Sequence, residues 1–287
     1  MRKLILVLAL FVWTSPASAG TGAEGQGSET LAPAVRVIAT PAEGDTLLLP
    51  PRWPRVWNAS VEYAGQSVSG QQPRWHTYTA SVGRRFSRGA LAVQVLKTRR
   101  FEFDDQAVAV DGYLDLWRGS YANLQLQHAP ESDVLPRANA GAELFQGIAG
   151  GWEGSAGYRY QRFPAADVNL YVLTAGRYTG RWYLRQRNTI ASTGGERAAS
   201  HSLSIRRYLD SADNYLELGA GAGSEVVEIT SVGAGNPVVD LRTAQFAAAR
   251  VQHFLSPSFG GSLALTVNDY DGLPTRWGMS VGVVTRW

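Results

Sequence analysis

The sequence contains no cysteine, and this absence excludes several kinds of site. Without thiols the protein cannot form disulfide bonds, a thiolate zinc site or a cysteine nucleophile. Lysine is nearly as scarce, because only Lys3 and Lys97 occur and arginine supplies almost all of the positive charge. Charged residues make up 18% and aromatic residues 10% of the chain. This composition is not that of a disordered protein.

Long apolar runs are also missing. The one apolar run, residues 4–12, follows the basic Arg2 and Lys3 and precedes the small residues 17–19. This order predicts a secretory signal peptide over residues 1–19, cleaved after Ala19. A membrane-spanning helix needs about 18 or more apolar residues, which this run lacks. Removal of the leader takes away Arg2 and Lys3, which leaves 25 of the 27 basic residues against 24 acidic ones. Because the mature chain is then almost neutral, we expect no nucleic-acid partner.

The mature chain divides into two parts by composition. Residues 20–55 are rich in small residues and proline, and they predict a flexible periplasmic segment. Residues 56–287 show apolar and polar residues in alternation, with no sustained helical pattern. In the last segment Trp277, Met279 and Val281 share one face, and Arg276 and Ser280 share the other.

This alternation predicts about fourteen strands, with twelve as the alternative count. The expected strand segments are residues 56–64, 75–86, 89–101, 107–117, 119–128, 138–147, 151–163, 168–178, 180–190, 199–209, 213–223, 238–252, 258–268 and 275–287. Short connections, such as 87–88 and 179, alternate with longer polar ones, such as 129–137 and 191–198. Short periplasmic turns opposite longer extracellular loops are typical of an antiparallel up-and-down barrel in the outer membrane.

Strand length and aromatic placement favour this all-β transmembrane barrel over a soluble secreted β-sandwich that binds a ligand. The segments are long enough to cross a bilayer, and aromatic residues cluster near their ends. The chain also stops on an aromatic residue of an alternating strand. Such an ending is typical of the sorting signal that the barrel assembly machinery reads, here Trp287, Thr285, Val283 and Val281. We therefore expect the outer membrane of a Gram-negative cell envelope, with its lipid and lipopolysaccharide as neighbours.

One region fits the alternation poorly. Around residues 243–249, Gln245 falls on the expected lipid face and Phe246 on the expected polar face. Residues 219–223 are rich in glycine, but no helix follows them to bind phosphate. We interpret this stretch as a tightly packed strand.

Glycine and aromatic patterns at the strand ends carry a family resemblance. Residues 135–144 (LPRANAGAEL), 157–160 (GYRY), 168–171 (VNLY) and 176–183 (GRYTGRWY) resemble the YaiO-type outer-membrane β-barrel family. The resemblance runs from about residue 55 to the end of the chain. It implies an outer-membrane barrel, and some relatives carry tetratricopeptide repeats before the barrel, as polysaccharide exporters do. This chain has no such repeat, and the family supplies no catalytic residues.

The candidate site is the inner wall of the barrel. The side chains expected to line it are Arg159, Arg181, Arg185, Arg187, Arg242, Arg250, Asp111, Asp115, Glu143, Glu153, Glu217 and Asp240. One hypothesis is a lumen filled by salt bridges; the other is a pore in which arginines select anions. We expect no cofactor and no metal.

These patterns predict a passive envelope component or a channel, with surface polysaccharide as a candidate partner. An outer-membrane enzyme acting on lipid or lipopolysaccharide is the alternative from another class. His201 and Ser202 are the residues that invite it. Neighbours in one strand point to opposite faces, however, which argues against a catalytic pair.

Overall fold

The computed structural model describes residues 56–68, 74–100, 103–229 and 238–287. The predicted leader, residues 1–19, and the predicted periplasmic segment, residues 20–55, lie outside the described residues. The strands are β1 (Trp57–Val68), β2 (Trp75–Phe86), β3 (Gly89–Arg100), β4 (Phe103–Asp115), β5 (Ser120–His128), β6 (Ala138–Ile148), β7 (Trp152–Arg162), β8 (Asp167–Thr179), β9 (Trp182–Thr193), β10 (Glu196–Tyr208), β11 (Tyr215–Ile229), β12 (Val238–Ser256), β13 (Phe259–Tyr270) and β14 (Arg276–Arg286). The short 3-10 helix η2 (Ala149–Gly151) joins β6 to β7. No helix within the described ranges is long and apolar enough to cross a membrane.

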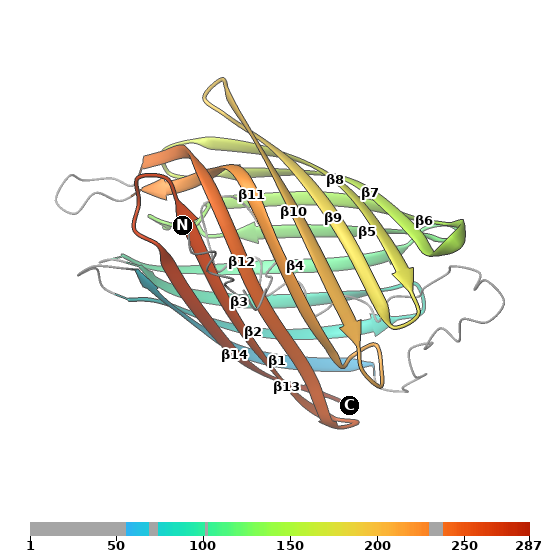
Figure 1. The fold of residues 1–287 in the computed structure, drawn as a ribbon. Coiled ribbons are helices and arrows are strands. Elements are labelled where there is room, and N and C mark those ends of the chain that lie inside the picture. Colours follow the sequence, from blue (N-terminus) through green and yellow to red (C-terminus); the bar gives the residue numbers. More distant parts are fainter. Residues whose placement is uncertain (1–55, 69–73, 101–102, 230–237) are drawn as a thin grey trace, which may run out of the picture.

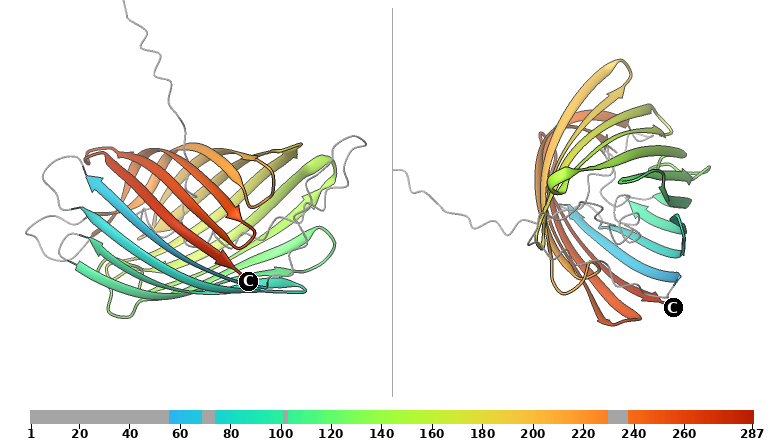
Figure 2. Two further views of the ribbon diagram at one scale, coloured as in Figure 1. Left: turned by 90° about the horizontal axis from the view of Figure 1, so that it is seen from below. Right: turned by 90° about the vertical axis from the view of Figure 1, so that its right-hand side faces the viewer.

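The fourteen strands form one closed antiparallel barrel, in which each strand pairs with its neighbours in sequence (Figures 1 and 2). β1 pairs with β14, and the backbones of Trp57 and Trp287 exchange two hydrogen bonds of 3.1 Å. Closure leaves no strand edge unpaired, which is the condition for crossing a lipid bilayer with strands. The β-sandwich alternative is therefore wrong, and the expected strand count is confirmed.

The outer surface is apolar because alternate side chains point to opposite faces of the sheet. On β14, Trp277, Met279 and Val281 are exposed, whereas Arg276 and Ser280 are buried on the inner side. Exposed leucine, valine and isoleucine side chains continue this surface on the other strands. An apolar exterior with a polar interior is the arrangement of a membrane barrel rather than of a water-soluble one.

The two ends of the barrel differ in their connections. We call one end the turn end, because it carries compact turns such as 87–88 and 180–181 together with Trp57 and Trp287. The opposite end, the loop end, carries the connections 129–137, 163–166 and 271–275. One expected loop is wrong: β9 and β10 extend through residues 191–198, and only Gly194 and Gly195 form the turn. Their φ angles of 56° and 89° suit glycine.

The poorly alternating part of β12 has a physical explanation. Phe246 is buried on the inner face, opposite Gly221 of β11. A Cβ on Gly221 would lie 2.3 Å from Phe246 Cζ. The glycine-rich strand therefore makes room for an aromatic ring inside the barrel, and Gln245 is exposed on the outer face.

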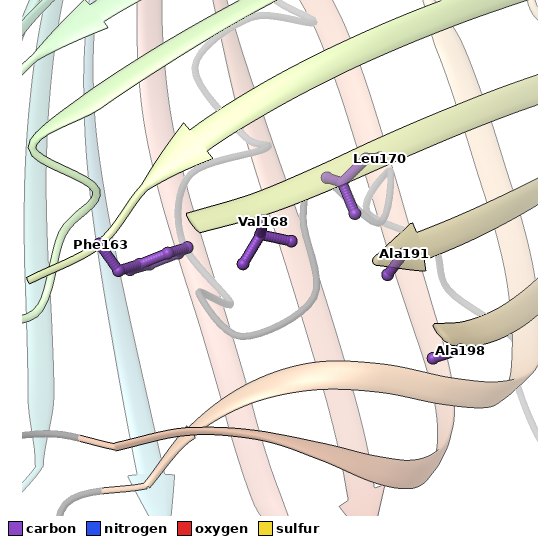
Figure 3. Packing of buried hydrophobic residues seen from close by; sticks show 5 residues of the cluster. All are labelled: Phe163, Val168, Leu170, Ala191 and Ala198. Atoms are coloured by element: carbon purple, nitrogen blue, oxygen red, sulfur yellow. The ribbon is translucent and has the colours of Figure 1, made fainter. Parts of the chain in front are cut away.

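An apolar cluster lies inside the barrel toward the loop end (Figure 3). Its members come from the connection after β7 and from the loop-end parts of β8, β9 and β10, and they are Phe163, Val168, Leu170, Ala191 and Ala198. The strand register places Val168 and Leu170 on the inner face, and they are 0% and 2% exposed. This part of the interior is therefore packed rather than open.

Candidate functional site: a charge-paired inner wall and an inward-folded loop

The inner wall carries a carboxylate, Glu143 of β6, that is surrounded by polar side chains of nearby strands. Ser155 Oγ donates a hydrogen bond of 2.5 Å to Glu143 Oε1, and Arg187 Nη1 lies 3.4 Å from Glu143 Oε2. Glu143 faces Gly157 on the neighbouring strand. A Cβ added to Gly157 would lie 3.0 Å from Cβ and Cγ of Glu143, so the glycine leaves room for this side chain. The side chains of Glu143 and Arg187 are only 14% and 12% exposed, so this ion pair is largely removed from water.

A second carboxylate, Asp111 of β4, is connected to an arginine through an amide. Asp111 accepts hydrogen bonds from Gln125 Nε2 at 2.9 Å and from Asn123 Nδ2 at 3.1 Å. Gln125 Oε1 in turn accepts a hydrogen bond of 2.5 Å from Arg159 Nη2. The amide dipole of Gln125 thus points its donor at the carboxylate and its acceptor at the guanidinium.

The third carboxylate, Glu153 of β7, is held by two tyrosines. Tyr183 and Tyr121 donate hydrogen bonds of 3.0 and 3.3 Å to its two oxygens. Tyr183 also stacks on Tyr178, with ring centroids 4.1 Å apart, and Tyr121 stacks on Phe145 at 4.5 Å. Glu153 is therefore fixed within a group of aromatic rings rather than directed into free space.

The arginines inside β4 to β9 do not give this wall an excess of positive charge. Arg159, Arg185 and Arg187 face the inside together with Asp111, Glu143 and Glu153. Arg185 interacts electrostatically with both Glu143 and Glu153. These three arginines are therefore matched by three nearby carboxylates, and Asp105 and Asp115 of β4 add further negative charge to this part of the wall.

The wall formed by β10 to β1 is also paired. Arg206 Nε donates to Glu217 Oε2, and Arg250 Nη2 lies 3.9 Å from Glu62 Oε2. The side chains of Arg250 and Glu217 are each 2% exposed. Near the loop end, the guanidinium groups of Arg276 and Arg100 lie 4.6 and 5.3 Å from the ring centroid of Trp75. Ion pairs thus also involve buried charged side chains on this half of the wall.

The connection between β5 and β6 folds into the barrel. Asp105 of β4 faces the inside and its carboxylate accepts three backbone hydrogen bonds from this loop, from Asp133 at 3.0 Å and from Val134 and Leu135 at 2.7 Å. Leu135 packs against Leu96 and Ala107 on the inner wall. Val134 and Leu135 are each 1% exposed. The segment 129–137, which we call the inward loop, therefore narrows the lumen near the loop end.

Comparison with known proteins identifies the family. A model described as the YaiO membrane beta barrel domain matches residues 58–227, more than half of the chain. The chain belongs to the YaiO membrane β-barrel family. The comparison with curated protein sequences gives no significant match.

Solved structures similar to this YaiO-family barrel are outer-membrane barrels. The CymD monoaromatic hydrocarbon channel is 8% identical, with a TM-score of 0.57, and the match covers 94% of this chain and 98% of that one. A bacterial polysaccharide outer membrane secretin is 9% identical, with a TM-score of 0.52 and coverage of 81% and 99%. At such low identity these similarities show the fold alone.

The strand register of the YaiO-family barrel places most of the predicted lining residues on the inner face. These are Arg159, Arg185, Arg187, Arg242, Arg250, Asp111, Asp115, Glu153 and Glu217. Arg181 is placed elsewhere, because it lies in the turn between β8 and β9 and donates a 2.7 Å hydrogen bond to the carbonyl of Leu209. The side chain of Asp240 lies outside the described residues. The role of the set in conduction stays a prediction.

His201 and Ser202 lie on opposite faces of β10. His201 is exposed on the outer face and its Nδ1 lies 2.6 Å from Asn188 Oδ1, whereas Ser202 is buried inside. This arrangement does not bring a base to the serine hydroxyl. Within the described residues, no group of three or more histidines and carboxylates could hold a metal ion.

Sequence reasoning missed Asp105, the residue that holds the inward loop. The expected strand began at residue 107, which left Asp105 in a connection, whereas β4 begins at Phe103. The alternation of Asp105, Ala107 and Ala109 on one face could have extended the strand by this amount. Nothing in the alternation indicates that a distant loop folds back onto that face.

Proposed function

We propose that this protein is a passive outer-membrane channel that is closed at rest, with the loop end facing the cell exterior. The observation that carries the proposal is the capture of the inward loop by Asp105 through three backbone hydrogen bonds. Hydrogen bonds to a charged acceptor are stronger than neutral ones. One carboxylate therefore anchors three backbone amides of the loop to the inner wall, and loss of this anchor would favour release of the loop and a wider lumen.

Recordings from planar lipid bilayers test this proposal. We expect the unmodified protein to give no large, stable current steps, and Asp105→Ala to give frequent ones because the loop amides lose their acceptor. Asp104→Ala is the matched control, because Asp104 is the preceding residue but pairs with Lys97 on the outer surface at 3.3 Å. A large steady conductance of the unmodified protein, or identical recordings from all three proteins, would refute the closed channel.

We propose that the opened lumen prefers anions only weakly. Arg159, Arg185 and Arg187 are matched by carboxylates along β4 to β9, so the arginines leave no excess of positive charge on that wall. Replacement of Glu143 by Gln in the Asp105→Ala background removes one negative charge and should raise anion selectivity, measured as a shift of reversal potential in a salt gradient. If Arg185→Ala and Arg187→Ala leave this selectivity unchanged, the arginines do not line the conducting path.

A role with surface polysaccharide is the second candidate, and one observation favours it. Arg276 contacts the rings of both Trp75 and Tyr270, at 4.6 and 4.8 Å, on the inner face near the loop end. Aromatic faces beside guanidinium groups suit acidic sugars. An acidic oligosaccharide should then block the current of Asp105→Ala, and block by a neutral oligosaccharide of the same size would argue against this candidate.

A further inference from the structure

An apolar groove lies on the outer surface of the barrel, outside the lumen. It has a volume of about 530 Å³ and crosses β1, β14, β13 and β12. Its floor contains small residues, Gly65, Ala247 and Ala249, and larger side chains border it. The bordering side chains point outward and include Trp277, Met279 and Leu265, which are 61%, 50% and 48% exposed. The shape is a trough between apolar ridges on a surface that faces lipid.

The groove lies in the half of the barrel near the loop end. Trp277 is the second residue of β14, which begins at the loop end, and Ser67 lies near the end of β1. Gly65 pairs with Met279 and Ser67 with Trp277. In the proposed orientation this half lies in the outer leaflet of the outer membrane, where lipopolysaccharide is the lipid.

Polar and cationic side chains lie at the border of the groove that is nearer the loop end. Arg74 and His76 line it, and Tyr63 Oη lies 2.8 Å from His76 Nδ1. Arg99 pairs with His76 across the sheet and, two residues away on the same outward face, Lys97 pairs with Tyr78. We call Arg74, Lys97 and Arg99 the cationic rim. Arg74, Lys97 and Arg99 are exposed.

Acidic neighbours offset part of this charge. Asp104 lies opposite Arg99 in the strand register and pairs with Lys97 at 3.3 Å. Asp269 on β13 accepts a hydrogen bond from Thr275 at 2.7 Å. The three basic side chains still outnumber these two carboxylates. Arg74 and Arg99 are long enough to reach up from the sheet to the level of lipid headgroups. Guanidinium groups bind phosphate through two parallel hydrogen bonds.

We propose that the groove and the cationic rim together form a binding site for lipid A, the phosphorylated and acylated anchor of lipopolysaccharide. One acyl chain lies along the trough of Gly65, Ala247 and Ala249, and a glucosamine phosphate is bound by Arg74 and Arg99. Apolar surface and positive charge occur side by side at the depth where this lipid presents acyl chains and phosphates. The site depends on the outer-membrane orientation of the barrel, but it does not depend on whether the lumen conducts.

The test measures lipid binding to the folded full-length protein by native mass spectrometry in detergent. The probes are bisphosphorylated lipid A, monophosphoryl lipid A and phosphatidylglycerol. We expect preference for the bisphosphorylated form, and the double variant Arg74→Ala and Arg99→Ala should weaken its binding about tenfold or more. The matched control is Arg84→Ala with Arg207→Ala, which removes two outward arginines near the turn end.

A second variant tests the groove itself. Ala247→Phe fills the trough and should weaken binding of both forms of lipid A, whereas Ala140→Phe, on the outer face of β6, should not. Resistance of the unboiled proteins to unfolding in detergent gels verifies that each variant is folded. Equal binding of lipid A and phosphatidylglycerol, or unchanged binding by both the double variant and Ala247→Phe, would overturn the proposal. Because bilayer currents test the closed channel and native mass spectrometry tests lipid binding, failure of one proposal can be distinguished from failure of the other.

Discussion

At the scale of single residues, several inward side chains fit inside the barrel because the neighbouring strand has a glycine at that position. Phe246 lies over Gly221, Tyr183 lies over Gly176, and Thr266 lies beside Gly278. In each case a Cβ on the glycine would come within 2.6 Å of the neighbouring side chain. Dense interiors tolerate such additions poorly, because neighbouring atoms have little room to move.

Gly221→Ala should therefore destabilise the barrel. The added methyl would lie 2.3 Å from Phe246 Cζ and 2.7 Å from the carbonyl oxygen of His201, so a loss of about 1–3 kcal/mol is expected from overpacking. Urea unfolding in lipid vesicles measures it. Gly154→Ala is the control, because its new methyl would meet only the carbonyl of Thr174 at 3.8 Å. Equal stability of both variants would contradict the packing argument.

Ion pairs inside and outside the barrel should differ in their contribution to stability. Glu143→Gln leaves Arg187 without its charged partner in a largely dehydrated site, and we expect a loss of about 3 kcal/mol. Asp104→Asn breaks the ion pair between Asp104 and Lys97, which are 48% and 54% exposed. It should lower the free energy of unfolding by only about 0–1 kcal/mol. Urea unfolding at neutral pH compares the two variants. A larger loss of stability for Asp104→Asn than for Glu143→Gln would contradict the conclusion that the inner ion pair contributes more.

At the scale of elements, the turn between β10 and β11 connects several strands at the turn end. Asn214 accepts a hydrogen bond from the backbone of Phe254 at 2.7 Å and donates one to Asp210 at 2.6 Å. Arg286 of β14 donates to Asp213 at 2.6 Å and lies 3.9 Å from the ring centroid of Phe254. This turn therefore connects β11, β12 and β14 through side chains as well as through the sheet.

The same turn gives a prediction for pH. The hydrogen bond from Asn214 lowers the pKa of Asp210 below its ordinary value. A carboxylate whose folded-state pKa is lowered stabilises the protein above its unfolded pKa, and this stabilisation disappears as the pH falls through the folded pKa. Asn214→Ala should raise the pKa of Asp210 toward its ordinary value, which NMR titration of the labelled carboxyl carbon in micelles can measure. An unchanged pKa would show that Asn214 is not the cause.

Particular elements show what the sequence could predict. The fourteen strands and their inner and outer faces follow from two-residue alternation, because a slip of one residue would put the apolar face of a strand inside. The alternation places Phe246 on the inner face but could not explain how a large ring fits there, since this depends on Gly221 of the neighbouring strand. It also could not predict the inward loop, since residues 129–137 are polar enough for an external loop and their path depends on Asp105. The alternation predicts Arg181 in the lumen because it starts this strand at residue 180, whereas β9 starts at Trp182.

At the scale of the whole molecule, closure of the sheet should make the barrel resistant to detergent. Each strand has two hydrogen-bonded neighbours, so unfolding requires the loss of many backbone hydrogen bonds together. We expect unboiled protein to migrate faster than boiled protein in a denaturing gel. Deletion of residues 276–287 removes β14 and should abolish this difference. Identical migration of the boiled and unboiled full-length protein would contradict a closed barrel.

The pairing of β1 with β14 also determines when the barrel can be completed. Asn58 meets Arg286 at the far end of the chain, and contacts so distant in sequence form slowly because a very long segment must first be ordered. Until the two strands join, β1 and β14 each present a free edge that could pair with another chain. We therefore expect the joining of these two strands to be the slowest and most aggregation-prone step of biogenesis, and a folding helper to have its greatest effect at this seam.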